Sequence, residues 1–136
     1  MVPDDVELVR ADVGRLPGVA EAFSAEFYAT LFDLAPDLRR LFPTDLAEQR
    51  TKLFAELAVL VDRVLSVDGP DQLAAFERRA GELGERHGDY GVTGDMYPVV
   101  GRALLGALHE TVPGFDERHV AAWERVYRTV ADAMTA

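Results

Sequence analysis

Apolar residues recur at three- and four-residue spacing along nearly the whole chain. This spacing places them on one face of an α-helix. No segment alternates apolar and polar residues between turn signals, as a half-buried strand would. The pattern therefore predicts an all-α fold.

Proline, glycine and capping residues indicate where these helices begin and end. A Leu-Pro-Gly turn separates the first two helices, and Pro36 opens a short helical piece that Pro43 ends. A long helix follows, with Thr44 or Asp45 as its N-cap and Glu48 placed to complete a capping box. We expect helices at about residues 3–16, 19–34, 45–66, 72–87, 93–111 and 116–135.

The composition fits one compact domain over residues 1–136, because 49% of the residues are hydrophobic and 28% are charged. The net charge of -10 argues against nucleic acid as a partner, since binding phosphates needs Lys and Arg. The absence of cysteine excludes disulfides and thiol chemistry. No segment approaches the roughly 18 apolar residues of a membrane span, and the opening residues MVPDDVELVR are acidic where a signal peptide is basic. We therefore expect a cytoplasmic protein without a membrane span.

One of the three histidines lies on an apolar helix face. His87 continues the face formed by Leu73, Phe76, Ala80 and Leu83. A histidine in this place can be a buried side chain that is hydrogen-bonded to a backbone carbonyl. It can also be a ligand of a metal or of haem iron, because a porphyrin supplies the other nitrogens and a single imidazole then suffices. The pattern alone leaves both interpretations open.

Other chemistry carried by side chains finds little support in the sequence. His109 and His119 are expected on solvent faces or near a helix start, and no zinc-protease motif occurs. Neither Ser24 nor Ser66 lies in a nucleophile turn, and no glycine-rich phosphate loop is present. A bound group would therefore have to supply the chemistry.

Several segments resemble, in order and at workable spacing, those of bacterial globins. They are EFYATLFDLAPDLRRLFPTDLAEQRTKL, LGERHGDYGVTGDMYPVVGRALLGAL and AAWERVYRTVADAM. The similarity runs from about residue 6 to residue 134 and extends to the haem domain of flavohaemoglobins and to single-domain bacterial haemoglobins. It implies the globin fold, with helices in a three-over-three arrangement around haem b.

The resemblance also implies roles for individual residues. It makes His87 the iron ligand, whose Nδ1 proton is donated to a carbonyl or another acceptor. It makes Tyr28 and Gln49 the distal residues, which donate hydrogen bonds to a bound diatomic ligand. It implies that Arg86 pairs with a haem propionate. The other cofactor contacts that it implies are Phe42, Leu53, Leu83, Val92, Tyr97 and Val100.

The sequence matches only part of the cluster that surrounds the iron ligand in flavohaemoglobins. Tyr97 matches the tyrosine of that cluster, but the position of its glutamate falls past Ala136. We therefore expect less electron donation to the iron, without the push that favours peroxidase-like chemistry. We also expect no flavin or nicotinamide domain in this chain, so that a separate flavin reductase would restore ferrous iron.

The resemblance suggests three functions. The first is reversible binding of O2, and also of NO and CO, for oxygen transport or storage. The second is enzymatic, a nitric oxide dioxygenase that detoxifies NO with a separate reductase. The third is a globin-like sensor or interaction module, which the joint presence of His87, Phe42, Tyr28 and Gln49 disfavours. A homodimer is compatible with the resemblance, because an amphipathic face looks the same within and between chains.

Overall fold

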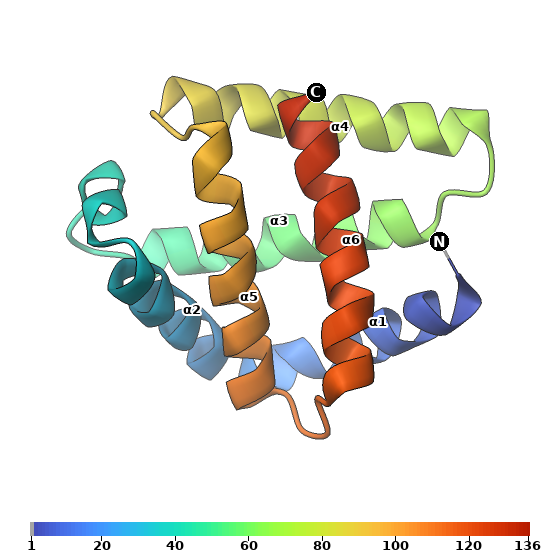
Figure 1. The fold of residues 1–136 in the computed structure, drawn as a ribbon, viewed down its shortest axis with the longest axis horizontal. Helices are drawn as coiled ribbons and strands as arrows, with labels where there is room; N and C mark the ends of the chain where they lie inside the picture. Colours follow the sequence, from blue (N-terminus) through green and yellow to red (C-terminus); the bar gives the residue numbers. More distant parts are fainter. Residues whose placement is uncertain (1) are drawn as a thin grey trace.

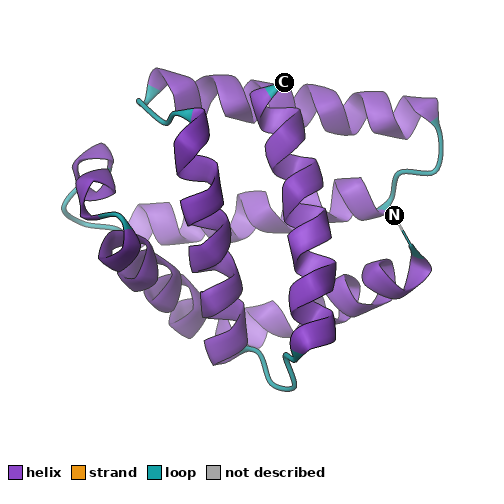
Figure 2. Cartoon of the chain, in the orientation of Figure 1, coloured by secondary structure: helices purple, strands orange, loops and turns teal. Residues whose placement is uncertain are grey.

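The structure, a computed structural model, describes residues 2–136. Over this range the chain is helical with short connections and forms no strand, which confirms the predicted all-α class (Figure 2). No helix in residues 2–136 is both long and apolar enough to cross a membrane. The elements are α1 (Pro3–Arg15), η1 (Leu16–Val19), α2 (Ala20–Leu34), η2 (Pro36–Leu41), α3 (Ala47–Leu65), α4 (Pro70–Asp89), η3 (Gly94–Met96), α5 (Tyr97–Thr111) and α6 (Glu117–Thr135).

The long helices form two layers that cross each other. In Figure 1, α1, α3 and α4 run across the view, while α5 and α6 run down it side by side and α2 lies obliquely. Helix α2 packs on α5, and α6 touches α1, α3, α4 and α5. This is the predicted three-over-three arrangement, and in it the end of α4 leads through a short connection into the start of α5 (Figure 1).

The start of α3 differs from the prediction. The helix begins at Ala47, its N-cap is Leu46, and no side chain caps it. Asp45 still accepts a hydrogen bond from the Ala47 amide at 3.0 Å, but Glu48 pairs with Lys52 on the surface instead of completing a capping box. The predicted N-cap at residue 44 or 45 is therefore wrong.

A single arginine orders the loop that connects η2 to the start of α3. Arg39 of η2 lies with its guanidinium 5.3 Å from the ring centroid of Phe32. It donates hydrogen bonds of 2.9–3.2 Å to the backbone carbonyls of Phe42, Pro43 and Thr44. These carbonyls have no helical partner, and a charged donor satisfies them. Arg39 thereby fixes the backbone that carries Phe42.

The core between the layers contains one fully buried carboxylate. Asp12 of α1 is 0% exposed, and its Oδ2 lies 2.6 Å from Nδ1 of His119 and 2.9 Å from Nε1 of Trp123. Its Oδ1 makes no hydrogen bond among the described residues, although the Arg15 guanidinium lies 3.6 Å away. His119 does lie at the start of α6, but it is buried, so the expectation of a solvent face is wrong for this histidine.

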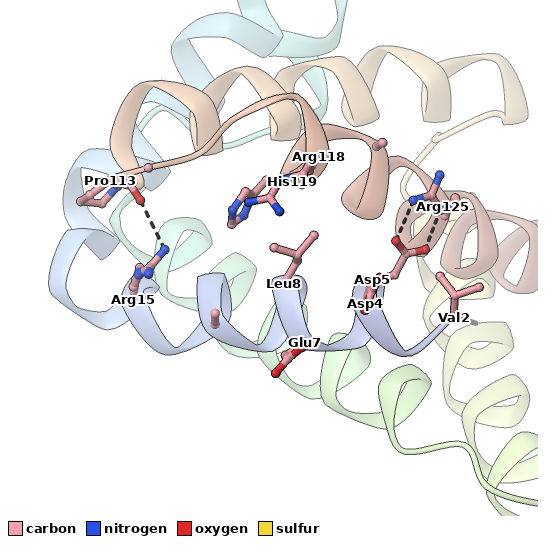
Figure 3. Close-up of a pocket in the computed structure, with 13 residues that line it drawn as sticks. Val2, Asp4, Asp5, Glu7, Leu8, Arg15, Pro113, Arg118, His119 and Arg125 are labelled. Atoms are coloured by element: carbon pink, nitrogen blue, oxygen red, sulfur yellow. Dashed lines mark hydrogen bonds and ion pairs between the residues drawn. The ribbon is translucent and has the colours of Figure 1, made fainter.

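A surface hollow of about 750 Å³ lies between α1 and α6 (Figure 3). At one end Asp5 and Arg125 form a double hydrogen bond of 2.5 and 2.6 Å, and at the other Arg15 donates to the Pro113 carbonyl at 3.3 Å. Its lining includes none of the residues that the resemblance assigns to a cofactor. The hollow therefore belongs to the packing of α1 on α6.

The Asp5–Arg125 pair predicts how acid changes stability. Asp5 is 3% exposed, and the hydrogen bonds from Arg125 hold its pKa below the usual 3.8 despite the opposing effect of burial. As the pH falls, the Asp5 carboxylate is therefore protonated in the unfolded chain before it is protonated in the folded protein. The stability that the pair contributes is complete well above pH 3.8 and is lost as the pH falls through the lower folded-state pKa.

Urea unfolding of Asp5→Asn should accordingly depend less on pH than that of the wild type between about pH 6 and about pH 3. Asp4→Asn, which removes an exposed carboxylate from the same turn, is the matched control and should follow the wild type. Parallel curves for Asp5→Asn and wild type would show that the pair contributes nothing to acid sensitivity.

Candidate functional site

His87 lies in the last turn of α4 with its ring already oriented. Its side chain is half-buried, on the same face as the buried residues Phe76, Ala80 and Leu83. Nδ1 lies 2.8 Å from the Leu83 carbonyl, which can only accept, so the proton is on Nδ1. This tautomer leaves the Nε2 lone pair free to bind a metal.

The chain turns sharply just after this histidine. The Val92 amide donates to the His87 carbonyl at 2.9 Å, and Gly91 adopts φ 95°, a left-handed conformation that glycine accepts without strain. The turn brings Val92 back to a half-buried position beside the end of α4. Gly91 thus allows the backbone to turn sharply just after α4.

Three residues assigned by the resemblance meet at the junction of α2, η2 and α3. The Tyr28 hydroxyl donates to the Gln49 backbone carbonyl at 3.3 Å. The rings of Tyr28 and Phe42 pack edge to face, with centroids 5.6 Å apart. Phe32 packs on Phe42 in the same way at 5.4 Å. Residues far apart in the sequence therefore form one aromatic cluster with a hydroxyl at its edge.

The hydroxyl of Tyr28 is a donor at neutral pH. Tyr28 is 4% exposed, and burial raises its pKa to about 12, against a smaller lowering by the positive charge of Arg50. A phenol that stays protonated can give a hydrogen bond to a partly negative ligand. Gln49, whose backbone carbonyl accepts the Tyr28 hydrogen bond, is half-buried, and its side chain carries an amide that can donate.

The apolar residues assigned to the site come from several helices. Leu83 is buried, whereas Leu53, Val92 and Val100 are half-buried and Leu53 and Val100 pack against the core. Further half-buried apolar side chains of the same segments pack there too, namely Phe54, Leu57, Met96 and Val99. Such surfaces suit a large apolar group with an edge toward water.

Tyr97 is held through its backbone. The Tyr127 hydroxyl of α6 donates to the Tyr97 carbonyl at 2.5 Å, and the Tyr127 ring lies directly over Gly101. Burial raises the pKa of both phenols, so both stay protonated. Among the described residues Tyr97 and His87 share no hydrogen bond, so the structure does not join this predicted pair directly.

Arg86 has a protein partner. It lies 3.9 Å from Glu56 of α3, and Glu56 also accepts two hydrogen bonds from Arg79, at 3.0 and 3.1 Å. More than half of the Arg86 side chain is exposed, and a long ion pair of this kind contributes little. Arg86 is therefore free to turn toward another anion at the end of α4.

The residues present fit haem. A single imidazole has one nitrogen fixed by a carbonyl and the other available, which is the donor that haem iron takes from a globin. The fold also supplies half-buried apolar side chains on α3, α5 and the turn after α4, and an aromatic cluster with a protonated hydroxyl on α2 and at the end of η2.

Sequence reasoning missed two residues that shape the site. Arg39 orders the loop of Phe42, and Tyr127 anchors the start of α5 at Tyr97. Both act on backbone carbonyls, which no side-chain motif records. For Arg39 the sequence holds one signal: Pro43 keeps Phe42 out of the helical conformation, so the chain there is a loop whose carbonyls need other donors.

Comparisons with known proteins agree with this geometry. The sequence profile of the globin family matches residues 25–134. A flavohemoprotein of Bacillus subtilis is 25% identical over 94% of this chain, and one of Deinococcus radiodurans is 28% identical over 98%. This chain spans only about a third of the length of these relatives (32% and 33%).

Solved structures give the same result. A bacterial globin of Campylobacter jejuni superposes with a TM-score of 0.81 at 22% identity, covering 98% of this chain and 96% of that one. An engineered carbene transferase from Rhodothermus marinus, described as a candidate nitric oxide dioxygenase, superposes with a TM-score of 0.79 at 30% identity. The match covers 98% of this chain and 90% of that one. The chain belongs to the globin family, and haem is its cofactor.

Proposed function

We propose that this globin reversibly binds O2, and also NO and CO, for oxygen supply or storage. The observation that carries the proposal is the buried, protonated Tyr28 hydroxyl, which packs beside Phe42 and bonds the Gln49 backbone carbonyl. This hydroxyl and the Gln49 side-chain amide would be the two neutral donors that a partly negative diatomic ligand requires.

Haem, when bound, supplies the iron that takes up the gas. His87 would hold it through Nε2, while the Leu83 carbonyl keeps the imidazole in the required tautomer. Tyr28 would release the Gln49 carbonyl and donate a hydrogen bond from its hydroxyl to the ligand, and the Gln49 amide would add a second hydrogen bond. Leu53 and Val100 would keep bulk water away from these donors.

A second candidate is a nitric oxide dioxygenase, in which O2, NO and one electron give nitrate. The likeness to the Rhodothermus marinus protein, whose description names that activity, favours it. The same Tyr28 and Gln49 would serve both functions. In this case a separate flavin reductase supplies the electron, and the globin acts as a single domain over residues 1–136. The homodimer and the cytoplasmic location stay predictions.

The absorption spectrum of the purified protein tests the proposal. A Soret band that shifts on reduction with dithionite and again with O2 and with CO is expected of a haem globin. Nitrate formation from NO, measured with and without a flavin reductase, then separates the dioxygenase from the carrier. Absence of a Soret band even after hemin is added would contradict both functions.

The distal donors predict a change in the rate of O2 release. Tyr28→Phe and Gln49→Leu should each speed O2 dissociation, because each removes a hydrogen bond to the ligand of about 1–2 kcal/mol, or roughly five- to thirtyfold. Stopped-flow displacement of O2 by CO measures this rate. Tyr90→Phe, at a tyrosine that is 73% exposed, is the matched control. Equal rates in all variants would place the ligand away from Tyr28 and Gln49.

A further inference from the structure

Gly84 lies on α4 one turn before His87, where the end of α6 meets α4 (Figure 1). A Cβ on Gly84 would overlap the carbonyl oxygen of Met134 and lie 2.8 Å from its carbonyl carbon and 3.0 Å from its Cα. These are backbone atoms, so no rotamer change can move them aside. The two helices therefore touch backbone to backbone, which only glycine permits here.

The same residue shares a peptide unit with the group that orients His87. The carbonyl that lies 2.8 Å from His87 Nδ1 belongs to the peptide bond between Leu83 and Gly84. A peptide unit is planar and moves as one body. A displacement of Gly84 away from Met134 would therefore also move the acceptor that fixes the imidazole.

We propose that Gly84 is a positioning residue for iron coordination. Its backbone contact with Met134 lets the last turn of α6 fix the position of α4. The Leu83–Gly84 peptide then sets the position of the carbonyl that orients the His87 ring. This inference rests on the proposed role of His87 as the iron ligand.

Helix α4 contains two matched controls. Gly81, one turn before Gly84, and Gly88, next to His87, have no atom within 4 Å of a Cβ built on them. An added methyl group at either position meets open space and slightly favours the helix. Alanine at positions 81, 84 and 88 thus makes the same chemical change on one helix, with contact at only one of them.

The experiment is resonance Raman spectroscopy of the reduced, ligand-free holoprotein, which reports the iron–histidine stretching band. Gly84→Ala should shift or broaden this band and release haem to apomyoglobin about tenfold faster or more, the fold-change that overpacking of this kind implies. Gly81→Ala and Gly88→Ala should keep the wild-type band. An unchanged band in Gly84→Ala beside a normal wild-type band would overturn the positioning role and leave the proposed function intact.

A double variant separates the contact from general loss of stability. Met134→Gly lets the last turn of α6 move its carbonyl away at low cost. Gly84→Ala/Met134→Gly should therefore fold, and its band should lie closer to the wild type than that of Gly84→Ala. A double variant no better than Gly84→Ala, whether folded or not, would overturn the positioning role. A wild-type protein with a Soret band but no iron–histidine band would refute the role of His87 itself, and with it that of Gly84.

Discussion

His87→Ala is expected to abolish stable haem retention. The variant lacks the imidazole whose Nδ1 lies 2.8 Å from the Leu83 carbonyl and whose Nε2 is free for iron. Haem that binds only the folded state adds to stability by mass action, about 2.7 kcal/mol at a free concentration a hundred times Kd. The variant should lose this increment. The measurements are Soret absorbance after gel filtration and melting temperature with and without hemin.

His109→Ala is the matched control, because His109 is an exposed histidine near the end of α5. It should keep both the Soret band and the increase in melting temperature that hemin gives. The haem-free melting temperatures of the two variants should be close to each other, since His87 is only half-buried. Retention of haem by His87→Ala at the wild-type level would remove His87 from the site.

Asp12→Ala should be the most destabilising of the variants considered. It leaves the buried donors of His119 and Trp123 without their shared acceptor. Loss of one partner from a buried charged network costs about 3–5 kcal/mol, which is a large part of the stability of a small domain. Urea unfolding of the haem-free protein measures the difference directly.

Asp4→Ala provides the comparison, because Asp4 is an exposed acid on the same helix. Its free energy of unfolding should stay within about 0.5 kcal/mol of the wild type. Asp12→Asn keeps an acceptor oxygen for one of the two donors, so it should cost less than Asp12→Ala. A loss below about 1 kcal/mol for Asp12→Ala would mean that the network fills space without stabilising the fold.

The all-α class and the order of the helices could be predicted because helical periodicity is a local property of the sequence. The start of α3 could not, since it depends on the Arg39 guanidinium, which binds carbonyls of residues 42–44 through space. Local capping rules favoured Thr44 or Asp45, whereas Leu46 is the N-cap in the structure. Tertiary contacts outweighed the local signal there.

The site shows the same division between local and distant information. The tautomer of His87 is set by Leu83, four residues earlier, and so lies within reach of a helical pattern. Tyr28, Phe42 and Gln49 were grouped only by family resemblance, because no spacing rule brings α2, η2 and α3 together. His119 was misplaced although α6 buries it on one face with Ala122, Trp123 and Val126.

A signal for the buried network was nevertheless present. Asp5 and Asp12 lie on the buried face of α1 with Val9, and Leu16, the first residue of η1, continues that face at helical spacing. An acid on such a face needs a buried donor elsewhere in the chain. The sequence pattern therefore predicts buried hydrogen-bond donors for these acids. Which residues donate to Asp12, more than a hundred positions later in the chain, could come only from the fold.

The distance between Asp12 and its partners has a consequence for the order of folding during synthesis. Both donors to the Asp12 carboxylate belong to α6, 107 and 111 residues later in the chain. Chains emerge from the ribosome from the N-terminus onward, so α1 is made before α6, and the Asp12 network cannot form until α6 is available. Until Trp123 has emerged, Asp12 stays hydrated and Val9 has no closed core to enter. The buried contacts that Asp12 makes with α6 can thus form only after more than a hundred further residues have been made.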